Sequence, residues 1–395
     1  METILGLSIL VNLLCFSFVK SQNYNVLDFG AKGDGQTDDS YAFAKMWNAT
    51  CGGEESIGKL VIPAGKTFLL QPRVFQGPCR SSSIHIQFDG VIVAPSNKEA
   101  WSIPKSQMWI GFSDVTGLAI VGSGTINGRG SSFWEQKVKV SERATALHFS
   151  RCDNLTINGI TLIDSPKSHI SIQVSKTVAI SKINISSPES SPNTDGINVH
   201  GSTDVNIFDS TIQSGDDCIA ISTGSVNINI TRINCGPGHG ISVGSLGEDG
   251  EKAEVSGVQV THCTFNRTMN GARIKTWPGG EGYARDISFE DITLIDAKNP
   301  IIIDQNYIDK GRHGQTDSAV MISNITFVGF RGTSLTKDAM TLDCSPITHC
   351  KDVVMDGINI TMAGGEKPTV NCQYVDGESS DINLMHDCFK GNTTA

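Results

Sequence analysis

Short β-rich phrases that recur along the 395-residue chain constrain its fold more than any other feature of the sequence. Each phrase alternates β-branched and polar residues and then meets Gly, Asn, Asp or Ser, which is typical of a strand followed by a turn. The steps between phrases run from 22 to 36 residues, as their first positions show: NLTINGITLI at 154, TVAISKINIS at 177, DVNIFDSTIQ at 204, VNINITRINC at 226, VSGVQVTHCT at 255, ARDISFEDIT at 284, VMISNITFVG at 320 and VVMDGINITM at 353.

Such phrases indicate the coils of a parallel β-solenoid, an all-β fold in which each coil buries its apolar side chains against the next. A β-sandwich also uses short alternating strands, but its turns should not repeat near-copies such as INGITL, ISKINI and ITRINC. A propeller stays an alternative, although the sequence carries no blade motif. The best helix candidate runs from Asp38 to Asn48, and we expect it to cap the open edge of the first coil.

The first residues indicate export. The stretch from Ile4 to Val19 is almost unbroken apolar sequence, although Glu2 stands where a positive charge is usual. This stretch is too short for a membrane span and fits the apolar region of a secretory signal. We therefore expect residues 1–21 to be a removed signal peptide, with a buried N-terminal helix as the alternative. Residues 22–395 contain no linker and should form one secreted, monomeric domain without membrane association.

The cysteines and the glycosylation sequons fit an exported chain. Cys15 lies in the expected signal, and the ten cysteines that follow it are an even set, which favours disulfides. No pair has zinc-finger spacing, so we expect no metal site among them. The sequence also predicts a glycoprotein, because eight asparagines begin an N-x-S/T sequon: Asn48, Asn154, Asn184, Asn229, Asn266, Asn324, Asn359 and Asn392.

The charge of the chain restricts its ligands. A formal net charge of −10 and an isoelectric point near 5.4 argue against a nucleic-acid binder. An acidic chain that handles an anionic polymer needs its basic residues concentrated beside the binding cleft. A local cluster of cations is therefore the feature to look for.

Four short motifs fall on consecutive expected coils. They are NTDG at 193–196, GDDC at 215–218, GHGIS at 238–242 and RIK at 273–275. Asp195 and Asp216 are 21 residues apart, and Asp217 and His239 are 22 apart, which is about one turn of the solenoid. Residues at equivalent positions of successive coils should stack about 4.8 Å apart on one face.

Three carboxylates gathered in this way suit the hydrolysis of a glycosidic bond. One must be protonated to donate to the leaving oxygen and another ionised to activate water, while a third like charge raises the pKa of the acid. Adjacent Asp216 and Asp217 would point to opposite faces of a regular strand, so the backbone must bend there, and Gly215 permits this. A single aspartate would more often be a solvated turn residue. The grouping on adjoining coils favours catalysis.

The neighbouring motifs supply a histidine and two cations. His239 stands between two glycines, one coil beyond the aspartates, where it could hydrogen-bond the acid and tune its pKa. Arg273 and Lys275 are two residues apart and should project from the same side of a strand, where they could bind a carboxylate. Tyr307 could stack on a sugar or hydrogen-bond it. We expect no cofactor and no metal.

These four motifs, in this order and spacing, resemble the signature of the polygalacturonases, a glycoside hydrolase family. The similarity extends from the phrase NVLDFGAKGDG at 25–35 to NPIIIDQ at 299–305. FQGPC at 75–79 and CGPGHG at 235–240 resemble the plant branch, notably the pollen-type exopolygalacturonases. The resemblance implies an inverting, metal-free, exo-acting hydrolase of α-1,4-galacturonan in cell-wall pectin, on a right-handed parallel β-helix.

The resemblance also implies a role for each residue. Asp216 would be the general acid, and Asp195 and Asp217 would hold the nucleophilic water, with acid and base carboxyls about 6.5–9.5 Å apart. His239 would support protonation of the acid. The residues expected to bind galacturonate are Asn193, Arg273, Lys275 and Tyr307.

Disulfide pairs can be suggested but not established from spacing. Cys218 and Cys235 resemble a pair seen in the family. Local pairs would join Cys344 to Cys350 and Cys372 to Cys388, and a pair between Cys51 and Cys79 would pin the N-terminal cap. Cys152 and Cys263 are left over.

Other functions stay open at this stage. A calcium-dependent pectate-type lyase would use the same solenoid, and the three aspartates could bind calcium. A hydrolase of rhamnogalacturonan or xylogalacturonan is a closer alternative, as is an endo-acting polygalacturonase. A wall-binding solenoid without turnover would show the same repeats and would differ only at the acid–base residues.

Overall fold

The computed structural model describes residues 23–53, 57–101, 107–308, 317–362, 365–384 and 388. The expected signal peptide, residues 1–21, lies outside these residues, as do Cys15 and Asn392. No helix among the described residues is long and apolar enough to cross a bilayer.

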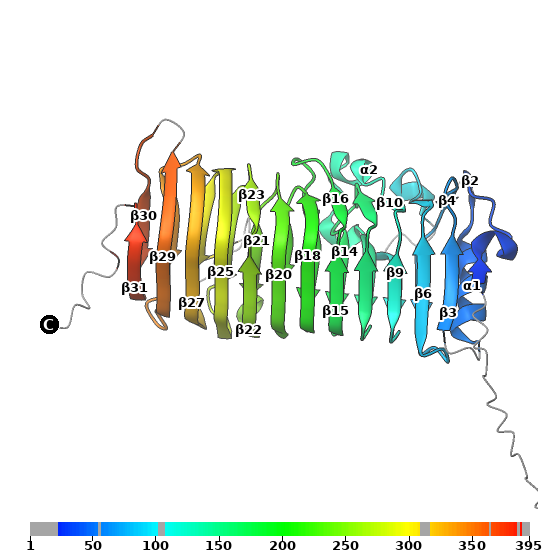
Figure 1. Ribbon diagram of the computed structural model, residues 1–395, viewed down its shortest axis with the longest axis horizontal. Helices are drawn as coiled ribbons and strands as arrows, with labels where there is room; N and C mark the ends of the chain where they lie inside the picture. The colour runs from blue at the N-terminus through cyan, green and yellow to red at the C-terminus, as the bar shows by residue number, and fades with distance from the viewer. Residues whose placement is uncertain are drawn as a thin grey trace, which may run out of the picture.

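The strands form two long ladders, and each coil of the chain contributes to both. Figure 1 shows the coils stacked in chain order from one end of the molecule to the other. One ladder, sheet B, has eleven strands that pair in chain order. They are β5 (Arg73–Gln76), β8 (Met108–Ser113), β11 (Thr145–Ser150), β14 (Ile170–Gln173), β17 (Ile197–His200), β19 (Ile219–Ile221), β21 (Ile241–Leu246), β24 (Asn270–Thr276), β26 (Asn299–Asp304), β28 (Asp338–Asp343) and β30 (Thr369–Gln373).

The other ladder, sheet A, has twenty strands. They are β1 (Asn23–Asn25), β2 (Asp34–Asp38), β3 (Ile57–Ile62), β4 (Thr67–Leu69), β6 (Ser83–Phe88), β7 (Val91–Val93), β9 (Leu118–Val121), β10 (Thr125–Asn127), β12 (Leu155–Asn158), β13 (Thr161–Ile163), β15 (Lys176–Ser181), β16 (Asn184–Ser186), β18 (Thr203–Gln213), β20 (Ser225–Cys235), β22 (Lys252–Thr261), β23 (Thr264–Asn266), β25 (Glu281–Ala297), β27 (Ala319–Ser334), β29 (Cys350–Met362) and β31 (Val375–Ile382). Neighbouring strands pair in parallel in both ladders. The chain is the all-β right-handed parallel β-helix expected from its repeats.

The alternation in each repeat becomes a column of core side chains. In sheet A, every second residue of a strand points inward and lies over its equivalent on the next coil. The Phe289 and Phe327 rings stack in this way, with centroids 5.9 Å apart. One such column is buried along seven coils: Ile180, Ile207, Ile230, Val260, Phe289, Phe327 and Met355. Each coil therefore removes the apolar face of its neighbour from water.

A residue in the left-handed backbone conformation forms a corner of the coil where the strand alternation is interrupted. These corners stack from one coil to the next. In the near-copies INGITL, ISKINI and ITRINC, the third residue is Gly159, Lys182 or Arg232, and all three have positive φ. Asp209 is the corner residue of the coil before Arg232 and also has positive φ. Its carboxylate forms an ion pair with Arg232, with Oδ1 and Nε 2.5 Å apart. Glycine and aspartate tolerate this conformation best, which accounts for their recurrence at the corner.

The N-terminal end of the stack is capped by a helix. α1 (Ser40–Cys51) begins two residues after the expected start and ends three residues after the expected end. Its buried Phe43 and Trp47 pack on aromatic rings of the first coils, with the Trp47 and Phe75 centroids 5.4 Å apart. The remaining helical segments are α2 (Ser131–Glu135) and the short 3₁₀ helices η1 (Val26–Phe29), η2 (Lys98–Ala100), η3 (Val140–Glu142) and η4 (Glu248–Gly250).

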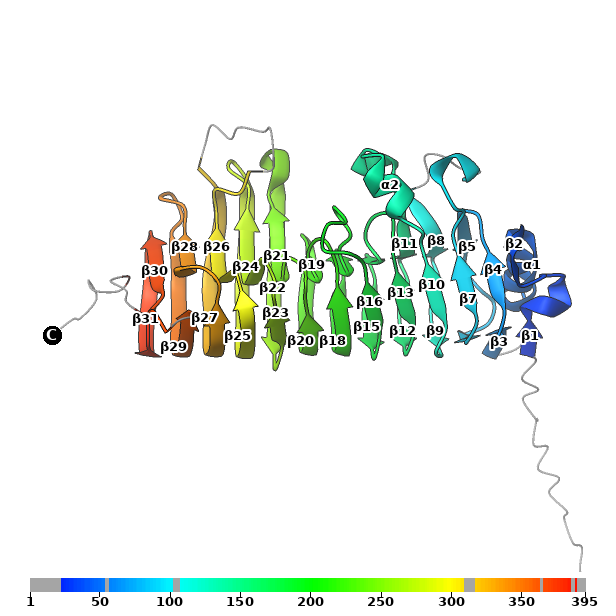
Figure 2. The ribbon, with the colours of Figure 1, turned by 90° about the horizontal axis from the view of Figure 1, so that it is seen from above.

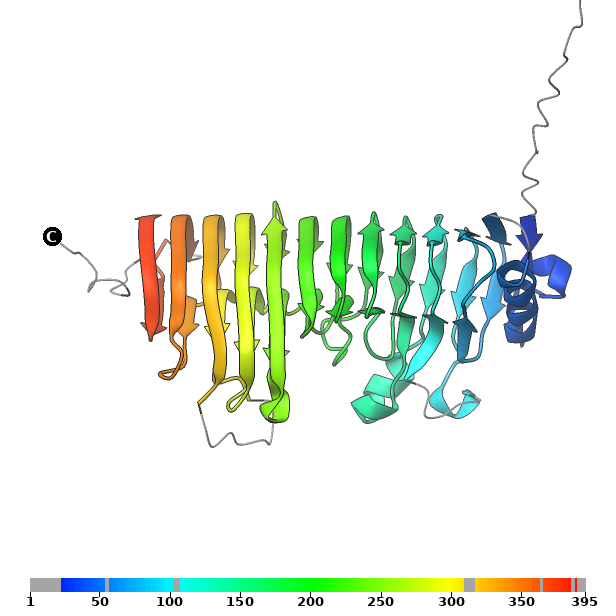
Figure 3. The same cartoon turned by 90° about the horizontal axis from the view of Figure 1, so that it is seen from below.

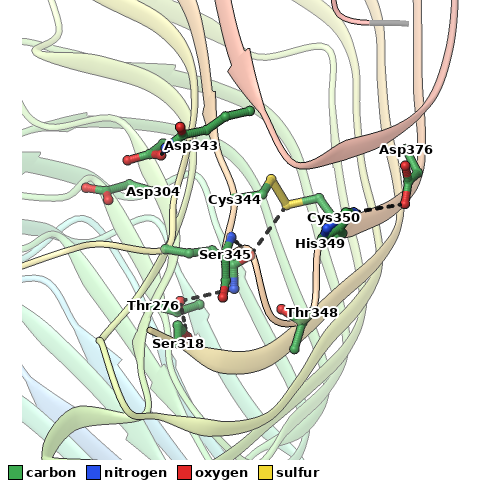
Figure 4. The surroundings of a disulfide bond; sticks show 12 residues. Thr276, Asp304, Ser318, Asp343, Cys344, Ser345, Thr348, His349, Cys350 and Asp376 are labelled. Carbon is green, nitrogen blue, oxygen red and sulfur yellow. Dashed lines mark hydrogen bonds and ion pairs between the residues drawn. A yellow bond between two sulfur atoms is a disulfide. The ribbon is translucent and has the colours of Figure 1, made fainter. Parts of the chain in front are cut away.

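Four disulfides join cysteines of the described residues, in the same pairs that the sequence suggested. Their partners are Cys51 with Cys79, Cys218 with Cys235, Cys344 with Cys350, and Cys372 with Cys388. Figure 4 shows the Cys344–Cys350 bridge near the C-terminal end of the stack. Cys152 and Cys263 are free and buried.

Candidate active site

The acidic motifs and the histidine motif occupy equivalent positions just before three neighbouring strands of sheet B. Asp195, Asp217 and His239 each precede by two residues the first residue of β17, β19 and β21. These strands pair in succession, so that Ile197, Ile219 and Ile241 lie side by side. The turns that carry the motifs are joined by backbone hydrogen bonds, such as the one that the Gly196 N–H donates to the Asp217 carbonyl.

Two outward rows of side chains run along sheet B and form the floor of the site. They alternate with inward residues such as Val199 and Ile274, which are fully buried. The first row is His148, Ser171, Asn198, Ala220, Ser242 and Arg273. The second row includes Gln173, His200, Lys275, Asp304 and Asp343. In Figures 2 and 3, α2 and the turn containing η4 project from the same side of the β-helix, with β14, β17 and β19 between them in chain order.

The Asp217 carboxylate contacts both cations of the site, Arg273 and Lys275. Its carboxylate accepts hydrogen bonds from Arg273 at 2.6 Å, from Lys275 Nζ at 3.0 Å, and from the Ser242 hydroxyl at 2.8 Å. The carboxylate is only 4% exposed. Burial acts to raise its pKa, but the charges of Lys275 and Arg273 outweigh burial and hold the pKa of Asp217 below its usual range. The carboxylate is therefore ionised at mildly acidic pH.

The pKa of Asp195 is raised well above its usual range. Burial and then the charges of Asp216 and Asp217 raise its pKa to about 8, against the opposing effects of Lys275 and of a hydrogen bond from Asn198. The sequence led us to expect that mutual repulsion would raise the pKa of the general acid, which the resemblance made Asp216. Lys275 and Arg273 are aimed at Asp217, and burial is the first cause of the raised pKa of Asp195.

Asp216 faces the histidine. Its Oδ1 atom lies 3.0 Å from His239 Nδ1, and its Oδ2 atom accepts a long hydrogen bond of 3.4 Å from the Asn193 amide. The Asp216 side chain is 21% exposed against 4% for Asp217. Asp216 therefore has the better access to a ligand in the cleft. Neither aspartate lies in a regular strand, since both belong to the bend between β18 and β19.

The expected substrate-binding cations are present but not free. Arg273 and Lys275 project from the same side of β24, as their spacing predicted, and both contact Asp217. Lys275 Nζ also lies 5.2 Å from the centroid of the Tyr307 ring. Tyr307 packs edge-on against Trp277. The structure thus brings all eight site residues proposed from the sequence into one region.

The same geometry bears on a metal site. Ligand atoms of Asp216, Asp217 and His239 lie within 4.8 Å of one another, a spacing that could hold a cation. However, two positive side chains already contact Asp217 and would repel a divalent ion. The donor set suits proton transfer better than cation binding.

Reasoning from the sequence missed two residues that hydrogen-bond the carboxyl groups of the site. Ser242 was quoted within its motif but given no role, and it donates to Asp217. Asn198 was not singled out, although it hydrogen-bonds Asp195 and donates to Ser168. Both lie in the outward row that contains Arg273, so counting the strand alternation back from Arg273 would have found them.

A parallel β-helix with three clustered carboxyls beside two cations defines a class, the carbohydrate-active β-helix enzymes. Residues 51–382 match the model of glycosyl hydrolases family 28. A probable polygalacturonase from Arabidopsis thaliana is 49% identical over 369 residues, covering 92% of this chain and 80% of the relative. A polygalacturonase from Prunus persica is 38% identical over 395 residues, covering 98% and 99%. The chain therefore belongs to glycosyl hydrolases family 28 and is a glycoside hydrolase of the polygalacturonase group.

A solved structure supports the same assignment. The endo-xylogalacturonan hydrolase from Aspergillus tubingensis superposes with a TM-score of 0.77 and 25% identity, covering 91% of this chain and 99% of that one. The β-helix and its length are thus shared with an enzyme whose name states an endo action on a substituted galacturonan.

Proposed function

We propose that this enzyme hydrolyses the α-1,4-glycosidic bonds of galacturonan in pectin with inversion, with Asp216 as general acid. This proposal rests on the different surroundings of two neighbouring carboxyl groups, Asp216 and Asp217. Asp217 is buried and held ionised by two cations, whereas Asp216 is more exposed and contacts His239. One group can keep its negative charge and activate water, while the other can approach a leaving oxygen.

The raised pKa of Asp195 adds one requirement. Asp195 holds a proton, since its pKa is raised to about 8. In our proposal Asp195 and Asp217 hold the nucleophilic water, and Asp216 donates to the leaving oxygen. Asp195 must therefore lose its proton before it can act on the water. His239 Nδ1, 3.0 Å from Asp216 Oδ1, is placed to support the protonation of Asp216.

Substrate charge is matched by the cations. A galacturonate carboxylate that reaches Arg273 and Lys275 would share them with Asp217, and charge-assisted hydrogen bonds favour that contact. Tyr307 and Asn193 complete the proposed contacts. We further propose that residues 1–21 direct secretion to the cell wall and that the domain acts as a monomer.

The test of the activity is a reducing-sugar assay on polygalacturonate near pH 5. We expect turnover by the wild type and a loss of at least about a hundredfold in Asp216→Asn, with binding retained. Near-wild-type turnover in the variant would show that the acid is assigned wrongly. A wild type without turnover would favour a wall-binding protein.

The mode of action needs its own measurement. The exo mode implied by the resemblance to pollen-type enzymes predicts that monogalacturonate accumulates from the first turnovers on oligogalacturonates. A ladder of intermediate products would establish an endo enzyme. Because the solved relative is named an endo-xylogalacturonan hydrolase, the same assay should include xylogalacturonan. Faster turnover of that polymer would make it the second candidate substrate.

A further inference from the structure

His169 is a fully buried histidine that lies beside the loop carrying Asp195 and has no part in the proposed chemistry. It directly precedes β14, and its backbone N–H donates to the carbonyl oxygen of Asp195 at 2.8 Å. Its ring Nδ1 lies 3.0 Å from the same carbonyl oxygen, and Nε2 lies 2.9 Å from the Ser187 hydroxyl. Both ring nitrogens are therefore hydrogen-bonded, and the ring has a defined orientation.

The partners of the ring fix its protonation state. A carbonyl oxygen can only accept, so Nδ1 carries the hydrogen and donates it to Asp195, and Nε2 accepts from the Ser187 hydroxyl. Burial lowers the pKa of His169 to about 4, against the opposing effect of backbone hydrogen bonds, so the ring is neutral at mildly acidic pH. A neutral ring held in one tautomer acts as a fixed link between its two partners.

The two partners of His169 lie at the two ends of the loop that carries Asp195. This loop, residues 187–196, connects β16 to β17 and has ten residues, whereas the equivalent loop of the next coil, residues 214–218, has five. Ser187 is the first residue of the longer loop, and Asp195 is its last residue but one. A longer loop has more conformations to exclude, so a link across its base restricts where Asp195 can lie.

The peptide group between Asp195 and Gly196 is held from both sides. Its carbonyl oxygen accepts from the backbone and from the ring of His169 on the preceding coil. Its N–H donates to the Asp217 carbonyl on the next coil at 2.9 Å. Because a peptide group is planar, these contacts fix the orientation of the main chain from Asp195 to Gly196. The direction in which the Asp195 carboxyl leaves the main chain is set by the same contacts.

We propose that His169 is a positioning residue for the hydrolysis, which holds Asp195 in the place where it acts on the nucleophilic water. The ring donates from Nδ1 to the Asp195 carbonyl and is anchored by Ser187 at the other end of the loop. This assignment rests on the proposed function, in which Asp195 helps to hold the water. A misplacement of a catalytic group by about 1 Å can lower turnover by about a hundredfold, so the link has a measurable effect on kcat.

The first experiment measures kcat and KM on polygalacturonate for substitutions of His169, with thermal melting to show that each variant is folded. His169→Leu removes both ring contacts and should lower kcat about thirtyfold while KM changes by less than about threefold, because the proposed substrate cations contact Asp217 and not His169. The amide nitrogen of asparagine takes the place of Nδ1, so His169→Asn should bring kcat to within about fivefold of the wild type. His169→Gln places its amide near Nε2 and should resemble His169→Leu. Equal kcat in the Asn and Gln variants would refute the role of the Nδ1 contact.

Two serine substitutions separate positioning from a general loss of buried hydrogen bonds. Ser187 and Ser202 are both buried, and the Ser202 hydroxyl donates to the His200 carbonyl between β17 and β18, away from the loop that carries Asp195. Ser187→Ala should lower kcat by about threefold to tenfold, and the matched control Ser202→Ala by less than about twofold. An equal effect of the two substitutions on kcat would show that the loss is not specific to the link.

A double-mutant cycle tests whether His169 acts through Asp195. In the Asp195→Ala background, His169→Leu should lower kcat by less than about threefold further, because the carboxyl that it positions is gone. A further loss as large as that in the wild-type background would overturn the proposal, and so would a folded His169→Leu enzyme with near-wild-type kcat. Failure of the proposed function looks different, since Asp195→Ala itself would then keep near-wild-type turnover.

Discussion

Replacing Lys275 by methionine should move the acid limb of the pH–rate profile to higher pH. Lys275 Nζ lies 3.0 Å from Asp217, and both side chains are buried. At an effective dielectric constant of about 20, unit charges at this distance attract by about 5.5 kcal/mol, which bounds the displacement at about four pH units. Arg273 remains at 2.6 Å, so we expect about one to three pH units.

The sign follows from the role of Asp217. Its pKa is lowered in the wild type. In the proposed mechanism Asp217 acts in its ionised form, so a raised pKa should remove activity at low pH first. The assay is kcat/KM on polygalacturonate across the acid range, with thermal melting to show that the variant is folded. Lys275→Arg keeps the charge and should leave the limb near its wild-type position. An unmoved limb in a folded Lys275→Met variant would refute the claim that this lysine keeps the base ionised.

Further outcomes can be checked with the same substrate. Asp195→Asn should lower kcat at least about a hundredfold if Asp195 must ionise to hold water, and near-wild-type turnover would show that its neutral form suffices. A strong chelator should leave activity within about twofold, because Arg273 and Lys275 occupy the place that a cation would take beside Asp217; loss of activity that calcium restores would revive the lyase alternative. Enzymatic removal of N-glycans from the native protein should not lower kcat/KM, because none of the seven sequon asparagines in the described residues belongs to sheet B; a large loss would place a glycan at the cleft.

The coil pattern was readable from the sequence only where successive phrases are near-copies of one another. The phrases were recognised from residue 154 onward, whereas the structure continues the ladders back to β1. In these first coils several strands have three residues, such as β4 (Thr67–Leu69) and β7 (Val91–Val93). Strands of this length also occur after residue 154, such as β13 (Thr161–Ile163) and β16 (Asn184–Ser186), but there they stand in near-copies such as INGITL and ISKINI. The near-copies were visible, but nothing in Lys182 or Arg232 indicates a left-handed corner, which the stack imposes on them.

The proximity of the candidate site residues was predictable, but their contacts with one another were not. Spacing by one coil brings Asp195, Asp217 and His239 together, because stacking depends only on the repeat length. Whether the Arg273 and Lys275 side chains turn to solvent or to Asp217 depends on space and burial beside them, which spacing does not describe. Spacing also could not predict the raised pKa of Asp195, because burial is its first cause.

Gly244 shows how the floor of the cleft makes the charged cluster possible. It follows Val243, the partner of Ile274, at a register shift between β21 and β24, and its φ of +114° is one that L side chains rarely adopt. A Cβ atom there would lie 2.1 Å from the Lys275 carbonyl and 3.0 Å from its Cγ. Any side chain at this position would therefore displace the stem that carries Nζ to Asp217. Because Gly244 has no side chain, the Lys275 side chain can extend back to Asp217. The ionised state of Asp217, the proposed base, depends on that contact.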